Sequence, residues 1–268
     1  MATSITVRVQ AKGGKFLADD IGGAEITIRD GHTGERLGGG LALGTDSGTI
    51  AGSYNPSNTS LSAIYTPADP PYTTSSSLQW LAVTSPTSGT TTPTSGLTVN
   101  LPKVTRPMLL AISALGPLGG LQSAHRAMLT QWIVPNQIIS GNPGFIVELP
   151  GLLVQVLQPA THLAILSNNL PYNVPFQANV TMMCGCQINH HQPWVPGDFT
   201  VQAVISQVGS SDVIATVPLS FSGTASLFSN TWTLPAGSTG FYQAVITAVQ
   251  ASTGNIGTGT VTFFVKQS

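Results

Sequence analysis

Hydrophobic and polar residues alternate with a period of two in several parts of the chain. Near the start, Ile5, Val7 and Val9 alternate with the polar residues Thr6 and Arg8. The same alternation runs through Ala24–Ile28, Phe176–Met182, Phe199–Ile205, Tyr242–Ala248 and Val261–Val265. A period of two places every second side chain on one face, so these segments are predicted to be β-strands with one buried face.

Turn signals rich in Gly and Pro separate the predicted strands. They occur at Gly13-Gly14, Asp30-Gly31, Gly38-Gly39-Gly40 and Pro70-Pro71, a spacing that suits short antiparallel strands better than βαβ units. From about residue 172 onward, six or seven strands at this spacing are typical of a β-sandwich. The predicted fold class is therefore all-β, with two antiparallel β-sandwiches in tandem.

Three segments differ from the alternating pattern. Leu121–Trp132 is the best candidate for a helix, although it is short, weakly periodic and followed by Pro135. Phe145–Leu157 is almost continuously apolar, which suits a strand buried on both faces near a domain boundary. Residues 85–95 are rich in Ser, Thr, Pro and Gly and are predicted to form an exposed loop.

We therefore predict a first β-sandwich over residues 1–117, a linking segment over 118–147 and a second β-sandwich over 148–268. The length of 268 residues suits two domains.

Charge is scarce and unevenly distributed. Asp, Glu, Lys and Arg make up 7% of the chain, against about 25% in ordinary globular proteins, and the net charge is -1. Without a run of Lys or Arg, neither a nucleic acid nor an anionic membrane surface is a suitable partner. The uncharged stretch 149–197 is interrupted by Pro and Asn too often for a transmembrane helix. The first ten residues lack the pattern of a signal peptide, so we expect either no export by that route or a leader removed before residue 1.

Two regions resemble known families. The sequence Gly23-Ala-Glu-Ile-Thr-Ile-Arg-Asp-Gly-His-Thr-Gly-Glu, followed by Thr45-Asp-Ser-Gly48, resembles a strand, turn and hairpin of transthyretin-like or carboxypeptidase-regulatory-like β-sandwiches. Trp232, Pro235-Ala-Gly and Tyr242 resemble the last strands of immunoglobulin-like modules of bacterial surface proteins. These resemblances imply a stalk, spacer or interaction module without catalytic residues, and an immunoglobulin-like second sandwich.

Reactive side chains are concentrated in Met182–His191. Both cysteines of the chain, Cys184 and Cys186, lie here, followed by His190 and His191. If the preceding alternation continues, the two thiols share the inward face about 7 Å apart, too far for an undistorted disulfide.

Three interpretations of the cysteine segment remain open. Together with His190 or His191, the thiols are suitable ligands for zinc or copper, although no Met follows Met183 as a type-1 copper site requires. Such a site would need further ligands, for instance His125 or His162. Alternatively, both thiols pack as small core residues. The third interpretation is an intermolecular disulfide.

Candidates for other chemistry are few. Trp80, Trp132 and Trp194 are candidate stacking platforms for a carbohydrate. The chain has no G-x-S-x-G, G-x-x-x-x-G-K or H-E-x-x-H motif, and few carboxylates for glycoside hydrolysis. An enzymatic function is therefore not predicted.

The leading functional hypothesis is a structural protein of the cell surface or extracellular space that assembles with copies of itself or with a larger protein complex. Faces with few charges can be buried without desolvating ions, and edge strands without Lys need cover. The alternatives are a copper- or zinc-binding or redox protein, and a carbohydrate-binding or enzyme-accessory module. Free thiols are also compatible with the cytoplasm.

Overall fold

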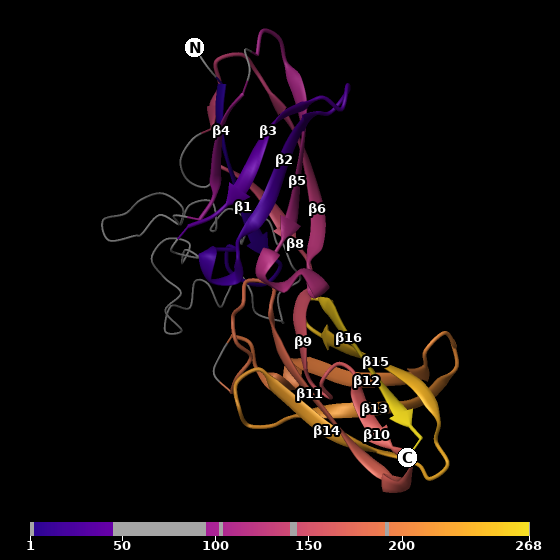
Figure 1. Cartoon of the computed structure of the whole chain (residues 1–268). Coiled ribbons are helices and arrows are strands. Elements are labelled where there is room, and N and C mark those ends of the chain that lie inside the picture. Colours follow the sequence, from indigo (N-terminus) through magenta and orange to yellow (C-terminus); the bar gives the residue numbers. More distant parts are fainter. Residues whose placement is uncertain (1–2, 45–94, 102–103, 140–143, 191–192, 268) are drawn as a thin grey trace. The chain divides into compact units, whose positions relative to one another are not determined.

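The protein is described by a computed structural model covering residues 3–44, 95–101, 104–139, 144–190 and 193–267 (Figure 1). The predicted all-β class is confirmed, because the helices among these residues are short 3-10 turns and the remaining elements are strands. No helix in the described ranges has the length and apolar character needed to cross a membrane.

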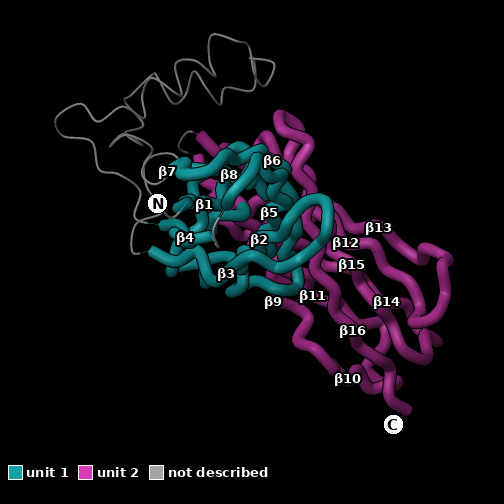
Figure 2. The backbone as a smooth tube through the Cα atoms, turned by 90° about the horizontal axis from the view of Figure 1, so that it is seen from above, with its two compact units in different colours: residues 1–151, 183–186 teal, residues 152–182, 187–268 magenta. Residues whose placement is uncertain are grey.

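The chain divides into two compact units (Figure 2). Unit 1 contains residues 1–151 and 183–186, and unit 2 contains residues 152–182 and 187–268. Each unit is described below by itself.

Unit 1 consists of two four-stranded sheets. Its elements are β1 Thr3–Ala11, η1 Asp19–Ile21, β2 Ala24–Asp30, β3 Arg36–Ala42, β4 Leu97–Leu101, β5 Met108–Gly116, η3 Leu118–Ser123, β6 His125–Ile133, β7 Ile138–Ile139 and β8 Phe145–Leu149. In one sheet β1 pairs antiparallel with β4 and parallel with β7 and β8, and the other has the order β3-β2-β5-β6. The predicted alternation is confirmed on β2, where Ile26 and Ile28 are buried and Glu25 is exposed. On β1 the single buried face is wrong, because Thr6, Arg8 and Gln10 are buried as well as the apolar residues between them.

The β2–β3 hairpin contains the turn predicted at Asp30. The Asp30 carboxylate accepts hydrogen bonds from the backbone N–H groups of His32 (2.8 Å) and Thr33 (2.9 Å). These two bonds hold the pKa of Asp30 below its ordinary value. Gly34 follows with φ +75°, a conformation that glycine adopts without strain.

Several expectations for unit 1 require correction. The helix expected over Leu121–Trp132 is instead the end of η3 followed by strand β6, because β6 pairs with β5 along its whole length, and this pairing outweighs helical propensity. The Gly38-Gly39-Gly40 turn lies inside β3, where a Cβ on Gly38 would lie 2.7 Å from Val99 of β4. The segment 118–147, expected to link two domains, contributes η3 and strands β6, β7 and β8 to unit 1.

Unit 2 is a two-layered sandwich. Its elements are β9 Leu152–Gln158, β10 Leu163–Leu166, η4 Ser167–Asn169, β11 Tyr172–Met182, η5 Pro196–Asp198, β12 Phe199–Gln207, β13 Val213–Phe221, β14 Leu227–Leu234, β15 Gly240–Gln250 and β16 Ile256–Lys266. The strand order is β10-β16-β15-β12-β13-β14-β11-β9, and among the described strands of unit 2 only the β10–β16 pairing is parallel. Strand β13 pairs with β12 up to Leu219 and with β14 at Ser220 and Phe221, so it passes from one layer to the other.

Aromatic side chains join the two layers of unit 2. Phe176 of β11 meets Phe263 of β16 edge-on at 6.4 Å, and Trp232 of β14 meets Tyr242 of β15 at 6.3 Å. Tyr242 also stacks on Phe263 at 5.4 Å. The expected continuous strand 145–157 is divided between β8 and β9 at Pro150–Gly151, which is where the border between the units lies.

Asp198 of η5 links the segment before β12 to the turn that follows β15. Its carboxylate accepts hydrogen bonds from the side-chain amide of Gln250 (3.0 Å), the backbone N–H of Ser252 (2.9 Å) and the Ser252 hydroxyl. Gln250 is buried, so its amide loses this partner without gaining water when the carboxylate is removed.

We expect Asp198→Ala to lower the free energy of unfolding by about 2–3 kcal/mol, because hydrogen bonds to a charged group are strong and leave a buried donor behind. Urea titration followed by pulsed hydrogen exchange of unit 2 peptides measures the loss. The control is Asp212→Ala, because this aspartate is exposed and alanine retains the backbone N–H that donates to the Ser210 hydroxyl. This variant should stay within about 0.5 kcal/mol of the parent. Equal effects of both substitutions would contradict the role of Asp198.

Candidate functional site

The two cysteines form a close pair in unit 1. Strand β11 ends at Met182, the chain turns at Met183 and Cys184, and Gly185 has φ +76°. The sulfur atoms of Cys184 and Cys186 lie 3.0 Å apart. The expectation that the strand continues through Cys184 and Cys186 is therefore wrong, because β11 ends at Met182.

Residues that follow β1 form the surroundings of Cys184. The backbone N–H of Lys15 donates a hydrogen bond to the Cys184 sulfur over 3.3 Å. A Cβ on Gly14 would lie 3.0 Å from that sulfur, so the absence of a side chain at residue 14 allows the close approach. Cys184 is 2% exposed, whereas Cys186 is half-buried.

The two thiols have unequal acidity. Burial raises the pKa of Cys184, but the hydrogen bonds from Cys186 and from the Lys15 backbone outweigh it, so the pKa of Cys184 is lowered overall. The hydrogen bond to Cys184 raises the pKa of Cys186, and burial acts in the same direction. The pair thus favours a thiolate on Cys184 and a thiol on Cys186.

The predicted metal ligands are only partly brought together. Cys184 and Cys186 are paired in unit 1, whereas His190 belongs to unit 2 and packs edge-on against Phe221 at 5.0 Å. His191 lies outside the described residues. Among the residues that are described, no group of three or more His, Cys, Asp or Glu is arranged to hold a metal ion.

The tryptophans predicted as binding platforms differ in exposure. Trp194 is buried, and its carbonyl accepts the backbone N–H of Asn189 at 3.0 Å, so it is part of the structure of unit 2 and presents no platform. Trp132 on β6 is 55% exposed and lies 5.8 Å from the His32 ring. Trp80 is outside the described residues.

Trp132 belongs to an exposed face on strands β5 and β6. Leu109 is paired with Trp132, Ala111 with Thr130 and Ser113 with Met128, and all six side chains share one face. Met128 is 67% exposed. We call this set, Leu109, Ala111, Ser113, Met128, Thr130 and Trp132, the β5–β6 outer face.

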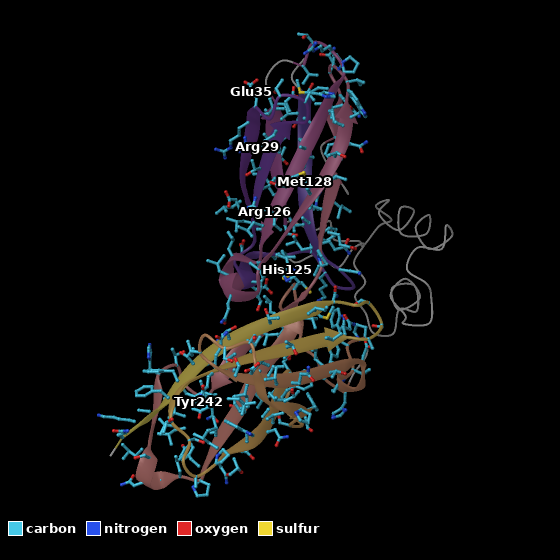
Figure 3. The ribbon with its side chains drawn as sticks, turned by 90° about the vertical axis from the view of Figure 1, so that its right-hand side faces the viewer. Arg29, Glu35, His125, Arg126, Met128 and Tyr242 are labelled. Carbon is cyan, nitrogen blue, oxygen red and sulfur yellow. The ribbon has the colours of Figure 1, made fainter. Side chains whose placement is uncertain are left out.

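Charged residues border the β5–β6 outer face. Arg126 pairs with Leu115 at one end of β6, and Glu25 and Arg29 occupy exposed positions on the adjacent strand β2. Figure 3 shows Arg29, Arg126 and Met128 along the same side of unit 1. Trp132 was predicted from the sequence but the face was not, because a helix was expected over the segment in which Arg126, Met128, Thr130 and Trp132 alternate with other residues.

Comparisons with known proteins leave the family unassigned. No protein-family model matches the chain, and no curated protein matches it. A DUF3823 family protein from Bacteroides ovatus aligns at 7% identity and a TM-score of 0.31, covering 99% of this chain and 100% of that one. Fibronectin(III)-like modules of Clostridium thermocellum CbhA align at 9% identity and a TM-score of 0.29, covering 91% and 78%.

An engineered protein aligns at 20% identity and a TM-score of 0.28 over 46% of this chain, which corresponds to 21% of the engineered protein's length. At scores this low, none of the alignments indicates a function, so the function is inferred from the residues of the chain itself.

Proposed function

We propose that the protein is a structural interaction module of the cell surface or extracellular space, and that the β5–β6 outer face binds a second copy of the chain. The observation that carries this proposal is the exposure of Trp132 and Met128 on the same face of β6, where Thr130 lies between them. An exposed patch that contains Trp and Met, with Arg at its border, has the composition typical of protein–protein interfaces.

The distribution of charge supports assembly. Within unit 2, the charged residues are Asp198, Asp212 and Lys266, and the β5–β6 outer face of unit 1 contains no charged residue. Burying such faces desolvates few ions, and an unpaired buried charge would cost several kcal/mol. Strand β6 is also the last strand in its sheet order, an edge that proteins usually cover or protect with charge.

We also propose a module type for each unit. The Asp30 turn followed by Gly34 supports a transthyretin-like module for unit 1, and Trp232 against Tyr242 supports an immunoglobulin-like module for unit 2. Modules of these kinds serve as spacers and contact surfaces, which fits the exposed face on unit 1 and the scarcity of catalytic groups in the sequence.

The test is the association state of the double variant Trp132→Lys, Met128→Lys. We expect the parent chain to dimerise in sedimentation equilibrium and the double variant to dimerise at least about 30-fold more weakly, because loss of a central interface residue costs about 2 kcal/mol or more. Val213→Lys, which replaces an exposed apolar residue of unit 2, is the matched control and should leave the dimer unchanged.

A parent chain that is monomeric at all concentrations, or a double variant that dimerises like the parent, would contradict the proposal. A glycan is the other class of occupant for an exposed Trp. Monomeric parent protein whose fluorescence changes with a glycan, and does not change in Trp132→Lys, would replace self-association by carbohydrate binding.

A further inference from the structure

The thiol pair has no part in the proposed interaction face, and its geometry points to a site of its own. We propose that Cys184 and Cys186 form a peroxide-oxidisable redox pair that closes into a reversible intramolecular disulfide.

The first argument is the distance between the sulfur atoms. They are 3.0 Å apart, and a disulfide bond of about 2.05 Å needs them to approach by roughly 1 Å. The pair lies in a turn beyond the end of β11, so this approach breaks no strand pairing of Met183 or Cys184. Gly185 between them already has φ +76°, a conformation that a residue with a side chain would resist.

The second argument is the division of roles between the two thiols. Cys184 accepts the Lys15 N–H and lies beside the Cys186 thiol, two contacts that stabilise a thiolate. At 2% exposure, Cys184 is open only to a small oxidant, and hydrogen peroxide is one. Cys186 is adjacent to it as the resolving thiol, the arrangement that limits further oxidation of a sulfenic acid.

The oxidation proceeds in two steps. The Cys184 thiolate attacks one peroxide oxygen, so an S–O bond forms, the O–O bond breaks and hydroxide leaves, taking the proton of the Cys186 thiol to become water. The Cys186 thiolate then attacks the Cys184 sulfur, so the S–S bond forms and the S–O bond breaks. The second hydroxide takes a proton from solvent, and the two electrons lost by the sulfurs have reduced the peroxide to two waters.

Reduction begins at the other sulfur. Cys186 is half-buried and therefore the sulfur that an external thiolate can attack. Cys184 then leaves as the thiolate, which is favourable because a thiol of lower pKa is the better leaving group. A second external thiolate attacks the sulfur of the first external thiol in the mixed disulfide. Cys186 is then released as a thiolate, and the two external thiols are joined in a disulfide.

The test is intact-mass analysis of the full chain before and after one equivalent of hydrogen peroxide, each sample then unfolded in N-ethylmaleimide. Reduced protein should take up two maleimides. Oxidised protein should take up none and have lost two hydrogen atoms, and dithiothreitol should restore both sites. Two maleimides after peroxide, addition of two oxygens to one sulfur, or a disulfide joining two chains would each overturn the proposal.

Single variants separate the roles of the two sulfurs. Cys186→Ser leaves Cys184 without a resolving thiol, so we expect a sulfenic acid that dimedone labels. Cys184→Ser should react with peroxide at least about tenfold more slowly than Cys186→Ser, because the Lys15 N–H that stabilises a thiolate is bonded to residue 184, and burial still raises the pKa of the remaining Cys186 thiol. Equal rates would assign no special role to Cys184. The measurement on the parent chain stands even if a variant fails to fold.

A thiol pair can bind zinc instead of forming a disulfide. The parent chain is therefore also incubated with zinc and then dialysed against a chelator. We expect the metal to be removed and peroxide to form the disulfide as before. Zinc that is retained and protects both thiols from peroxide would overturn the redox pair in favour of a metal site.

Discussion

Phe263→Ala is expected to destabilise unit 2 by about 3–5 kcal/mol, the usual loss when a fully buried phenylalanine is truncated. Phe263 is 1% exposed and contacts aromatic rings of both layers, Phe176 edge-on and Tyr242 by stacking. Its removal leaves a cavity between the rings of Phe176 on β11 and Tyr242 on β15. Neither ring can fill this cavity without moving its own strand. The urea midpoint of unit 2 peptides in pulsed hydrogen exchange should therefore fall sharply.

The neighbouring residue provides the control for this substitution. Phe264 lies on the opposite face of β16, is half-buried, and stacks on Phe241, which is 64% exposed. Phe264→Ala removes a similar volume from the surface, so we expect a loss of about 1 kcal/mol or less. If the two variants unfold at the same urea concentration, Phe263 does not hold the layers together as described.

Gly257→Ala is the second substitution with a large expected effect, about 2–4 kcal/mol, because it forces backbone atoms apart. A Cβ on Gly257 would lie 2.3 Å from the carbonyl oxygen and 2.8 Å from the carbonyl carbon of Leu152 on β9. Neither atom belongs to a flexible side chain, so β9 and β16 must separate. The same urea titration of unit 2 peptides measures this loss.

Gly197→Ala is the matched control for Gly257→Ala. A Cβ on Gly197 would meet nothing within 4 Å, and its φ lies outside the positive range that favours glycine. We expect it to be neutral or to stabilise by up to about 1 kcal/mol, since alanine restricts the unfolded chain. Destabilisation by both substitutions to the same extent would show that loss of glycine, and not contact with Leu152, is responsible.

The strands with one buried face were predictable from sequence, and the reason is their period of two. Ile26 and Ile28 on β2 and Phe176 to Met182 on β11 alternate without interruption, and all of these inward positions are buried. Strand β6 was not predicted, because its apolar residues occupy both faces, with Leu129 half-buried and Met128 exposed, and only its pairing with β5 shows which face is which.

Only part of the cysteine site could be predicted from the sequence. Sequence proximity singled out Cys184 and Cys186, because both lie in one short segment. The contributions of Lys15 and Gly14 come from residues about 170 positions earlier, and no local pattern connects them. The turn at Gly185, with its positive φ, brought the sulfurs together where an extended strand would have kept them apart.

Neither unit is a continuous piece of chain, because residues 183–186 belong to unit 1 although they are flanked on both sides by unit 2. A gene fragment encoding residues 1–151 would therefore yield the first sandwich without its thiols. The complementary fragment, residues 152–268, would carry both cysteines without the Lys15 N–H and with no Gly14 beside them. A recombination event at residue 151 would thus separate the sulfur atoms from the groups that set their acidity, so the two sandwiches are expected to be inherited together rather than exchanged as independent cassettes.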